Sequence, residues 1–248
     1  MSANSFVRAI TVTLALAVCM ASEAKAQSAP DQKWSVDAAI GWDNSISGNI
    51  NSSGVGTING QTTVITKNKY EDVYGTGLHL KVGVGYMVNP STEARATVSF
   101  QSLDADLTRM GDYGASNLYG QYDDYQSTTL DVGLRRYGAT NMNFRPYFEG
   151  SIGMGFNDAI DVELVAPQAG LVRPASDFYD GNVAFSFGVA GGVLWNANER
   201  VGIFTQLGLR YVTGLKEVDQ TLGTGLDEIN DKSARWTVPF VMGVRFGF

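Results

Sequence analysis

The chain has one histidine, His79, and an imidazole is the side chain best suited to proton transfer near neutral pH. A hydrolase or acyltransferase would place it beside a nucleophilic serine and a carboxylate. The sequence holds no G-x-S-x-G or comparable nucleophile motif. A histidine satisfied by polar neighbours is therefore the favoured interpretation, and the sequence predicts no catalytic residue and no enzyme. A lipid-modifying enzyme with His79 as its base is the less favoured alternative.

Metal ligands are present in number but not in a recognised spacing. The only cysteine is Cys19, so the chain has no His/Cys cluster of the kind that binds zinc. Acidic residues gather in three long polar segments, 104–124, 158–180 and 217–231, and oxygen ligands of this type suit Ca²⁺ or Mg²⁺. No stretch keeps the spacing of an EF-hand, and acidic surface segments usually only solvate. We predict no metal site and no cofactor, and divalent-cation binding by these segments stays open.

The overall charge excludes one class of partner. The formal net charge is −7, whereas a nucleic-acid-binding protein needs clustered Lys and Arg to neutralise phosphates. Hydrophobic residues make up 44% of the chain and charged residues 17%, a composition that does not by itself indicate a membrane protein. The pattern of these residues along the chain is more informative than their number.

The first 26 residues have the three parts of a secretory signal peptide. Arg8 is the basic residue, Ala9–Met20 is an apolar run too short to span a bilayer, and Ala24-Lys25-Ala26 is an A-x-A cleavage site. We predict a signal peptide over 1–26 and one mature domain over 27–248. A lipoprotein acylated at Cys19 is the alternative, which the bulky Val18 disfavours.

After the signal peptide, apolar and polar residues alternate in eight segments, as they do from Leu78 to Tyr86. A period of two is that of a β-strand with two different faces. Each segment reaches the ~9–11 residues that a tilted strand needs to cross the hydrocarbon of a bilayer. The eight predicted strands are Lys33–Ile46, Val73–Val88, Glu93–Leu107, Asp124–Gly138, Arg145–Asn157, Asn182–Trp195, Arg200–Gly214 and Ala234–Phe248.

The connections between these strands alternate between short and long. The short ones are 89–92, 139–144 and 196–199, and the long ones are 47–72, 106–123, 158–181 and 215–233. This layout predicts an all-β fold, an eight-stranded antiparallel transmembrane β-barrel of up-and-down topology with short periplasmic turns and long extracellular loops. The Ser/Asn/Gly-rich stretch Asn44–Gly60 is expected to be a flexible first loop.

Closing the sheet removes the unpaired backbone edges that lipid cannot satisfy, and eight strands leave an interior about filled by side chains. By parity, several charged residues face that interior: Asp37, Lys81, Arg95, Asp131, Arg135, Glu149, Arg210 and Arg245. Isolated buried charges are costly, so we expect these residues to form ion pairs that plug the lumen. The alternative is a narrow, porin-like diffusion channel whose ion pairs rearrange.

Aromatic residues occupy two kinds of position. The aromatic residues near strand ends predict two belts at the membrane–water interfaces. The expected periplasmic belt contains Trp34, Tyr86 and Trp195, and the expected outer belt contains Trp42, Tyr74, Phe185, Tyr211 and Trp236. Those in the long loops are expected either to contact a partner or to pack within the loops and extend the barrel: Tyr113, Tyr119, Tyr122, Phe178 and Tyr179.

The last strand ends in Val244-Arg245-Phe246-Gly247-Phe248, with aromatics at alternate positions. This ending resembles the signal by which outer-membrane barrels reach their assembly machinery, with Phe246 and Phe248 as the signal residues. Together with the signal peptide and the paired strands, the chain resembles the eight-stranded families of the OmpA transmembrane domain, OmpX and the opacity-type surface proteins. The resemblance implies an integral protein of the bacterial outer membrane with a structural, adhesive or small-pore role and seldom a catalytic one. Its implied partners are lipid and lipopolysaccharide, the barrel assembly machinery, and a host or phage surface ligand at the loops.

Overall fold

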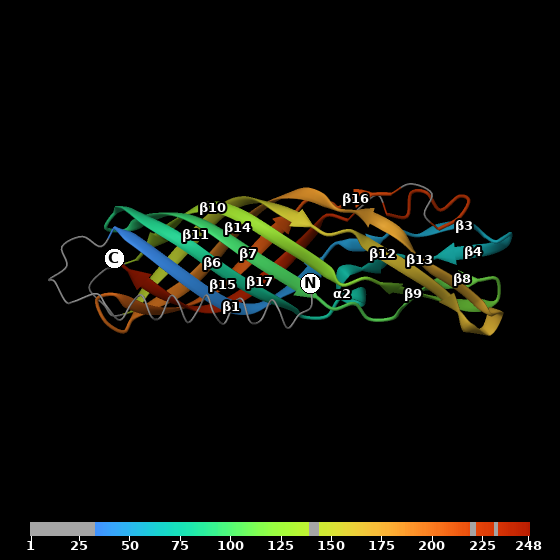
Figure 1. Ribbon diagram of the computed structural model, residues 1–248, viewed down its shortest axis with the longest axis horizontal. Helices are drawn as coiled ribbons and strands as arrows, with labels where there is room; N and C mark the ends of the chain where they lie inside the picture. Colours follow the sequence, from blue (N-terminus) through green and yellow to red (C-terminus); the bar gives the residue numbers. More distant parts are fainter. Residues whose placement is uncertain (1–32, 139–143, 219–221, 231–232) are drawn as a thin grey trace.

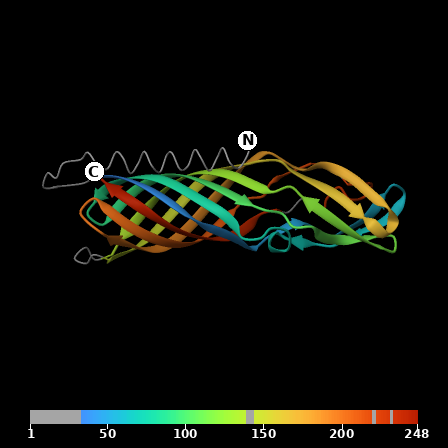
Figure 2. The ribbon, with the colours of Figure 1, turned by 60° about the horizontal axis from the view of Figure 1, so that its bottom comes forward.

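A computed structural model describes residues 33–138, 144–218, 222–230 and 233–248 (Figure 1). The predicted signal peptide, residues 1–26, lies outside the described residues. The described chain is elongated, with a β-barrel at one end and a second β-structure stacked on it at the other (Figures 1 and 2).

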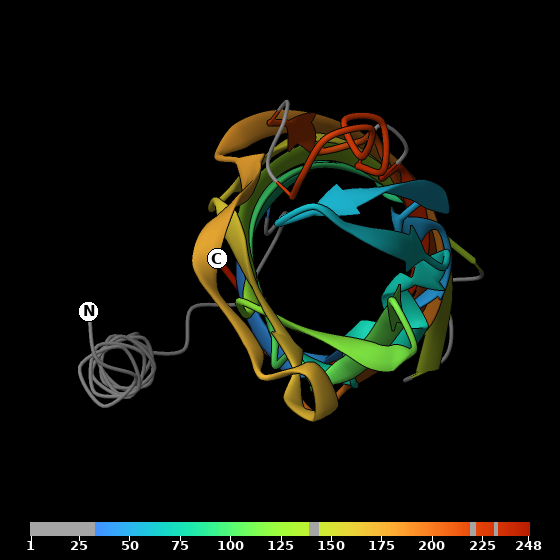
Figure 3. The same cartoon turned by 90° about the vertical axis from the view of Figure 1, so that its right-hand side faces the viewer.

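The barrel is a closed sheet of eight antiparallel strands in the order β1-β17-β15-β14-β11-β10-β7-β6, which confirms the predicted fold. Strand β1 pairs with both β6 and β17 and so closes the sheet. Seen along its axis, the wall surrounds a common centre (Figure 3). The barrel strands are β1 (Trp34–Ser47), β6 (Gly77–Asn89), β7 (Thr92–Leu103), β10 (Tyr125–Tyr137), β11 (Phe144–Asn157), β14 (Asn182–Asn196), β15 (Val201–Val212) and β17 (Arg235–Gly247).

The alternation in the sequence accounts for the two faces of this wall. In β1, Ile40 and Trp42 are 58% and 48% exposed, whereas Asp37 and Asp43 are each 1% exposed. The apolar side chains thus point out of the barrel and the polar ones into it, the reverse of a soluble β-protein. Strands of 12 to 15 residues exceed what a bilayer crossing requires. The wall therefore exposes a continuous apolar surface suited to lipid.

Aromatic pairs mark both ends of this apolar surface. Near the short turns the rings of Trp34 and Tyr86 are 4.9 Å apart, and those of Phe144 and Trp195 are 6.3 Å apart. Near the opposite end Tyr211 lies 5.2 Å from Trp236. Such rings are favoured at membrane–water interfaces. Tyr74 was expected in the outer belt, but it is 3% exposed and packs inside the structure above the barrel.

The long connections form structure of their own, which corrects the expectation of open loops. A seven-stranded sheet has the order β16-β13-β12-β9-β8-β4-β3, and β2 pairs with β5. These two sheets, with helix α2 (Tyr70–Val73) and residues 222–230, are called the extracellular cap below. Its strands are β2 (Asn49–Asn51), β3 (Gly54–Ile58), β4 (Gln61–Ile65), β5 (Asn68–Lys69), β8 (Thr108–Tyr113), β9 (Ser116–Tyr122), β12 (Ile160–Ala166), β13 (Leu171–Asp180) and β16 (Lys216–Glu217). The 3₁₀ turn η1 (Pro167–Ala169) joins β12 to β13.

The stretch Asn44–Gly60, expected as a flexible loop, instead contains the end of β1 and strands β2 and β3. The physical reason is that β3 pairs with β4 along one edge and with the chain at Thr224, and buries Ile58 in the cap core. Thr57 exchanges backbone hydrogen bonds with Thr224 at 2.9 and 3.1 Å. A Cβ on Gly56 would lie 2.3 Å from the Thr224 carbonyl oxygen. Small and polar residues here permit close backbone approach rather than disorder.

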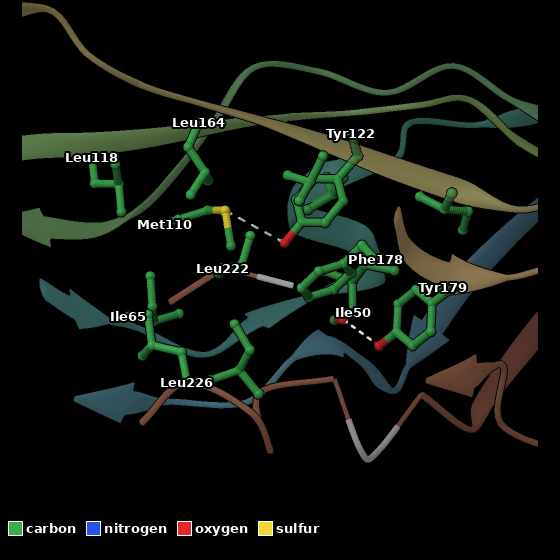
Figure 4. Close-up of a cluster of buried hydrophobic side chains, with 14 of the residues drawn as sticks. Ile50, Ile65, Met110, Leu118, Tyr122, Leu164, Phe178, Tyr179, Leu222 and Leu226 are labelled. Atoms are coloured by element: carbon green, nitrogen blue, oxygen red, sulfur yellow. Dashed lines mark hydrogen bonds between the residues drawn. The ribbon is translucent and has the colours of Figure 1, made fainter. Parts of the chain in front are cut away.

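The cap has its own hydrophobic core (Figure 4). Side chains with no more than 2% exposure come from all four long connections, and they include Ile50, Ile65, Met110, Leu118, Tyr122, Leu164, Phe178, Tyr179, Leu222 and Leu226. Buried hydroxyls are satisfied: Tyr179 donates to the Ile50 carbonyl at 2.6 Å, and Tyr122 donates to Asn51 Oδ1 at 3.0 Å. Of the five loop aromatics, Tyr122, Phe178 and Tyr179 therefore pack within the cap.

The inward face of the barrel changes character where the strands leave the membrane. In β7 the inward residues run from the polar Ser99 and Gln101 to the apolar Leu103, which is fully buried in the cap core. In β10 the inward series ends in the same way, with Ser127 followed toward the cap by Tyr125. The polar lumen is thus continuous with an apolar core that lies over its outer mouth.

Candidate functional site: the closed lumen

The side chains with the richest chemistry lie inside the barrel, and Glu149 is at their centre. Its carboxylate lies 2.7 Å from Arg135, 3.3 Å from Lys81 and 3.3 Å from Arg95. Arg135 is completely buried, and its guanidinium lies 4.0 Å from the centre of the Tyr147 ring. One carboxylate thus contacts cations from three strands and links them across the lumen.

Two further carboxylates extend this network toward the short turns. Asp37 lies 2.6 Å from Arg95, and Glu93 lies 2.7 Å from Arg245. Glu93 also accepts a 2.7 Å hydrogen bond from the Tyr137 hydroxyl. A Cβ on Gly85 would lie only 1.9 Å from Glu93 Oε1, so glycine is needed opposite this carboxylate. Glycines of the inward face leave room for buried charges.

A separate ion pair crosses the upper half of the lumen. Arg210 lies 2.9 Å from Asp131 and donates a 2.8 Å hydrogen bond to Ser186. Arg210 lines two small cavities, of about 50 and about 10 Å³. Volumes of this size hold a few water molecules at most. The lumen space that Arg210 borders is therefore filled by side chains rather than open.

The outer mouth of the lumen is closed by Arg235, the first residue of β17. Its guanidinium lies 3.9 Å from the centre of the Tyr125 ring and 4.8 Å from that of Tyr70. It also donates a 3.3 Å hydrogen bond to Gln101 Oε1. Tyr70 belongs to the cap and Tyr125 to the barrel, so this cation joins the two parts. At the same level His79 Nδ1 lies 3.7 Å from Asp43 Oδ2, and His79 is 4% exposed.

All eight charged residues singled out in the sequence lie on the inward face, where each contacts an opposite charge. Six of them join Glu93 in one network of ion pairs, and Asp131 and Arg210 form the pair that stands apart. Sequence reasoning missed Glu93 and Arg235. The inward position of Glu93 could have been predicted, because Glu93 lies two residues from Arg95 and so shares its face of the strand. Arg235 lies at the end of its expected strand, where the alternation does not predict its direction.

The remaining chemical expectations concern metal and membrane helices. In the ranges that the structure describes, no three His, Cys, Asp or Glu side chains converge as metal ligands. No helix of the described residues is both long enough and apolar enough to cross a bilayer.

The two C-terminal phenylalanines lie at the end of the last barrel strand. Phe246 lies in β17, and Phe248 is 66% exposed, with backbone hydrogen bonds to Trp34 at 2.9 and 3.1 Å. Their role as an assembly signal stays a prediction.

The apolar outer wall, the closed hydrogen-bonded sheet and the polar, ion-paired interior together define a membrane-spanning β-barrel. Eight antiparallel strands with short turns at one end and long connections at the other are the layout of integral outer-membrane barrels. The protein is thus a small outer-membrane β-barrel with a folded extracellular cap.

A comparison with solved structures found similar chains among outer-membrane and surface proteins. A major outer membrane protein from Thermus thermophilus is 15% identical, with a TM-score of 0.48, over 87% of this chain and 98% of that chain. The outer membrane protein OprG from Pseudomonas aeruginosa is 13% identical, with a TM-score of 0.46, over 86% and 95%. Neisserial surface protein A is 13% identical, with a TM-score of 0.44, over 88% and 98%.

At these values the likeness carries no argument about function. No protein-family description matches the sequence, and no curated protein matches it as a relative.

Proposed function

We propose that this protein is a non-enzymatic envelope protein whose extracellular cap contacts other molecules at the cell surface. The observation that carries the proposal is that the four long connections build one folded body with its own core above a plugged lumen. A rigid body presents a fixed surface, so the cap loses little conformational entropy when it binds a partner. Outer-membrane lipid would surround the wall, lipopolysaccharide would border the cap, and the barrel assembly machinery would insert the chain.

The hairpin turns of β3–β4, β8–β9 and β12–β13 lie together at the far end of the cap (Figure 1). They are the parts of the protein farthest from the membrane, so they are the first to meet a host cell or a phage. Turn residues on a rigid scaffold are typical recognition elements. We place the contact surface at this tip.

The test replaces residues 167–170, the η1 turn and the glycine after it, by an Asn-Gly turn. It measures attachment of expressing bacteria to host cells and of phage to the bacteria. We expect attachment to fall to the level of cells without the protein. Arg136→Gln, on the outward face at the periplasmic end, is the control and should leave attachment unchanged. Equal attachment by cells with and without the protein would refute the proposed role.

A second measurement separates this function from a narrow pore. Because buried ion pairs fill the described lumen and the cavities that Arg210 lines are small, wild-type protein in a planar bilayer is expected to show no steady current steps. The same silence is expected from Arg135→Ala, since Arg95 and Tyr147 still obstruct the section beside it. Steps from the wild type that change in size in Arg135→Ala would favour the channel.

A further inference from the structure

The periplasmic end of the barrel contains a cavity of about 530 Å³, called the periplasmic vestibule below. It is more than ten times larger than the lumen cavity of about 50 Å³ above it. Arg145 and Arg245 line it, with Glu199 and Asn196 from the β14–β15 turn region and Trp34 and Leu194 as apolar wall. A volume in this range is that of small-ligand sites.

One of the two vestibule arginines is already neutralised. Arg245 lies 2.7 Å from Glu93, which is fully buried, and it also contacts the Tyr137 hydroxyl. Arg145 differs, since no carboxylate of the described residues lies within 4.0 Å of its guanidinium nitrogens. Its contacts are neutral: the Pro90 carbonyl at 3.1 Å and the Tyr137 ring at 4.4 Å.

These contacts hold the Arg145 guanidinium in place without satisfying its charge. Stacking on Tyr137 and one hydrogen bond to a carbonyl hold it, and neither of these partners carries a negative charge. A guanidinium in a recess is stabilised most by a charged acceptor, because charge-assisted hydrogen bonds are about twice as strong as neutral ones. The geometry therefore leaves a place for an anion beside Arg145.

We propose that the periplasmic vestibule binds the terminal carboxylate of a short periplasmic peptide. A carboxylate matches the single uncompensated cation, whereas a phosphate dianion would need further donors and, with its larger charge, would be repelled more strongly by Glu199. The Asn196 amide can pair with a peptide group, and Met87 and Leu194 of the lining can contact aliphatic side chains. The site is at the opposite end of the molecule from the cap, so it is independent of the surface-contact role.

The carboxylate could come from a free peptide or from the stem peptide of the cell wall, and one titration distinguishes them. Refolded full-length barrel in detergent is titrated calorimetrically with acetyl-Ala-Ala-Ala, with its C-terminal amide, and with a purified muropeptide that ends in a carboxylate. We expect the acid to bind at least about tenfold more tightly than the amide, the effect of one charge-assisted hydrogen bond. Binding by the muropeptide alone would assign the site to the cell wall and still support the proposal.

Variants give the direction of the effect. Arg145→Gln should weaken binding of the acid by about tenfold, and Glu199→Gln should strengthen it, because the carboxylate in the lining repels the ligand. Arg136→Gln removes a nearby cation outside the vestibule and should change nothing. Heat-modifiable migration on a denaturing gel shows that each variant is folded. Binding of the tripeptide acid and amide with the same measurable affinity, no binding of any of the three ligands, or ligand binding that is unaffected by Arg145→Gln and Glu199→Gln would overturn the proposal.

Discussion

Glu149→Ala is expected to destabilise the barrel strongly, so that it unfolds at a much lower urea concentration than the wild type. The substitution removes the carboxylate that lies 2.7 Å from Arg135 and 3.3 Å from both Lys81 and Arg95. Breaking a single buried ion pair costs about 3–5 kcal/mol, and here three cations lose a partner at once. Urea unfolding of the refolded protein in lipid vesicles, followed by heat-modifiable migration, measures the loss.

The matched control is Glu71→Ala in the cap, where Lys69 and Glu71 form an ion pair with side chains 51% and 45% exposed. An exposed pair contributes about 0–1 kcal/mol, so this variant should unfold at nearly the wild-type urea concentration. If the two variants unfold at the same concentration, the lumen network does not stabilise the barrel.

Phe178→Ala is expected to unfold the cap while the barrel persists. Phe178 is fully buried and packs edge-on against Tyr122 at 5.6 Å and Tyr179 at 5.0 Å. Removing a buried phenylalanine costs about 3–5 kcal/mol, which is a large share of the stability of so small a core. Protease added to intact cells should then cut the cap, while the membrane-embedded barrel still migrates as a folded species.

Val172→Ala is the control for Phe178→Ala, because Val172 is a cap residue that is 68% exposed. It tests whether loss of a buried side chain is what unfolds the cap. It should leave the cap resistant to protease. Simultaneous loss of the barrel and cap in Phe178→Ala would show instead that the two parts unfold as one unit.

The barrel could be predicted from the sequence because one physical rule governs all eight strands. Lipid selects apolar residues at every second position, and the same parity assigns Asp37 and Arg95 to the interior. Parity does not predict which charged residues form ion pairs with one another. Glu149 contacts Lys81 on a strand that is not its neighbour in the sheet, so this contact depends on the curvature of the closed wall.

The cap could not be predicted in the same way because it follows the opposite rule. In β12, Ile160, Val162 and Leu164 face a core while Asp161 and Glu163 face outward, the pattern of a soluble sheet. The strand is only 7 residues long, and it follows a β11 strand in which the apolar residues face lipid. The lipid-facing pattern of the barrel strands therefore does not predict strands in these segments. The acidic residues of these segments favour solvated loops. They do not distinguish a loop from a strand, however, because acidic side chains on the outer face of a sheet are solvated too.

The cap core draws side chains from all four long connections, with Ile65 from the first, Leu118 from the second, Leu164 from the third and Leu222 from the fourth. No single hairpin can bury its apolar residues alone, so the core is complete only after the last hairpin has crossed the bilayer. Contacts between such distant parts of a chain form late and slowly. A molecule arrested midway through insertion would display uncovered hydrophobic segments on the outside of the cell. A protease at the cell surface would therefore cut a partly inserted molecule and spare one whose cap is complete.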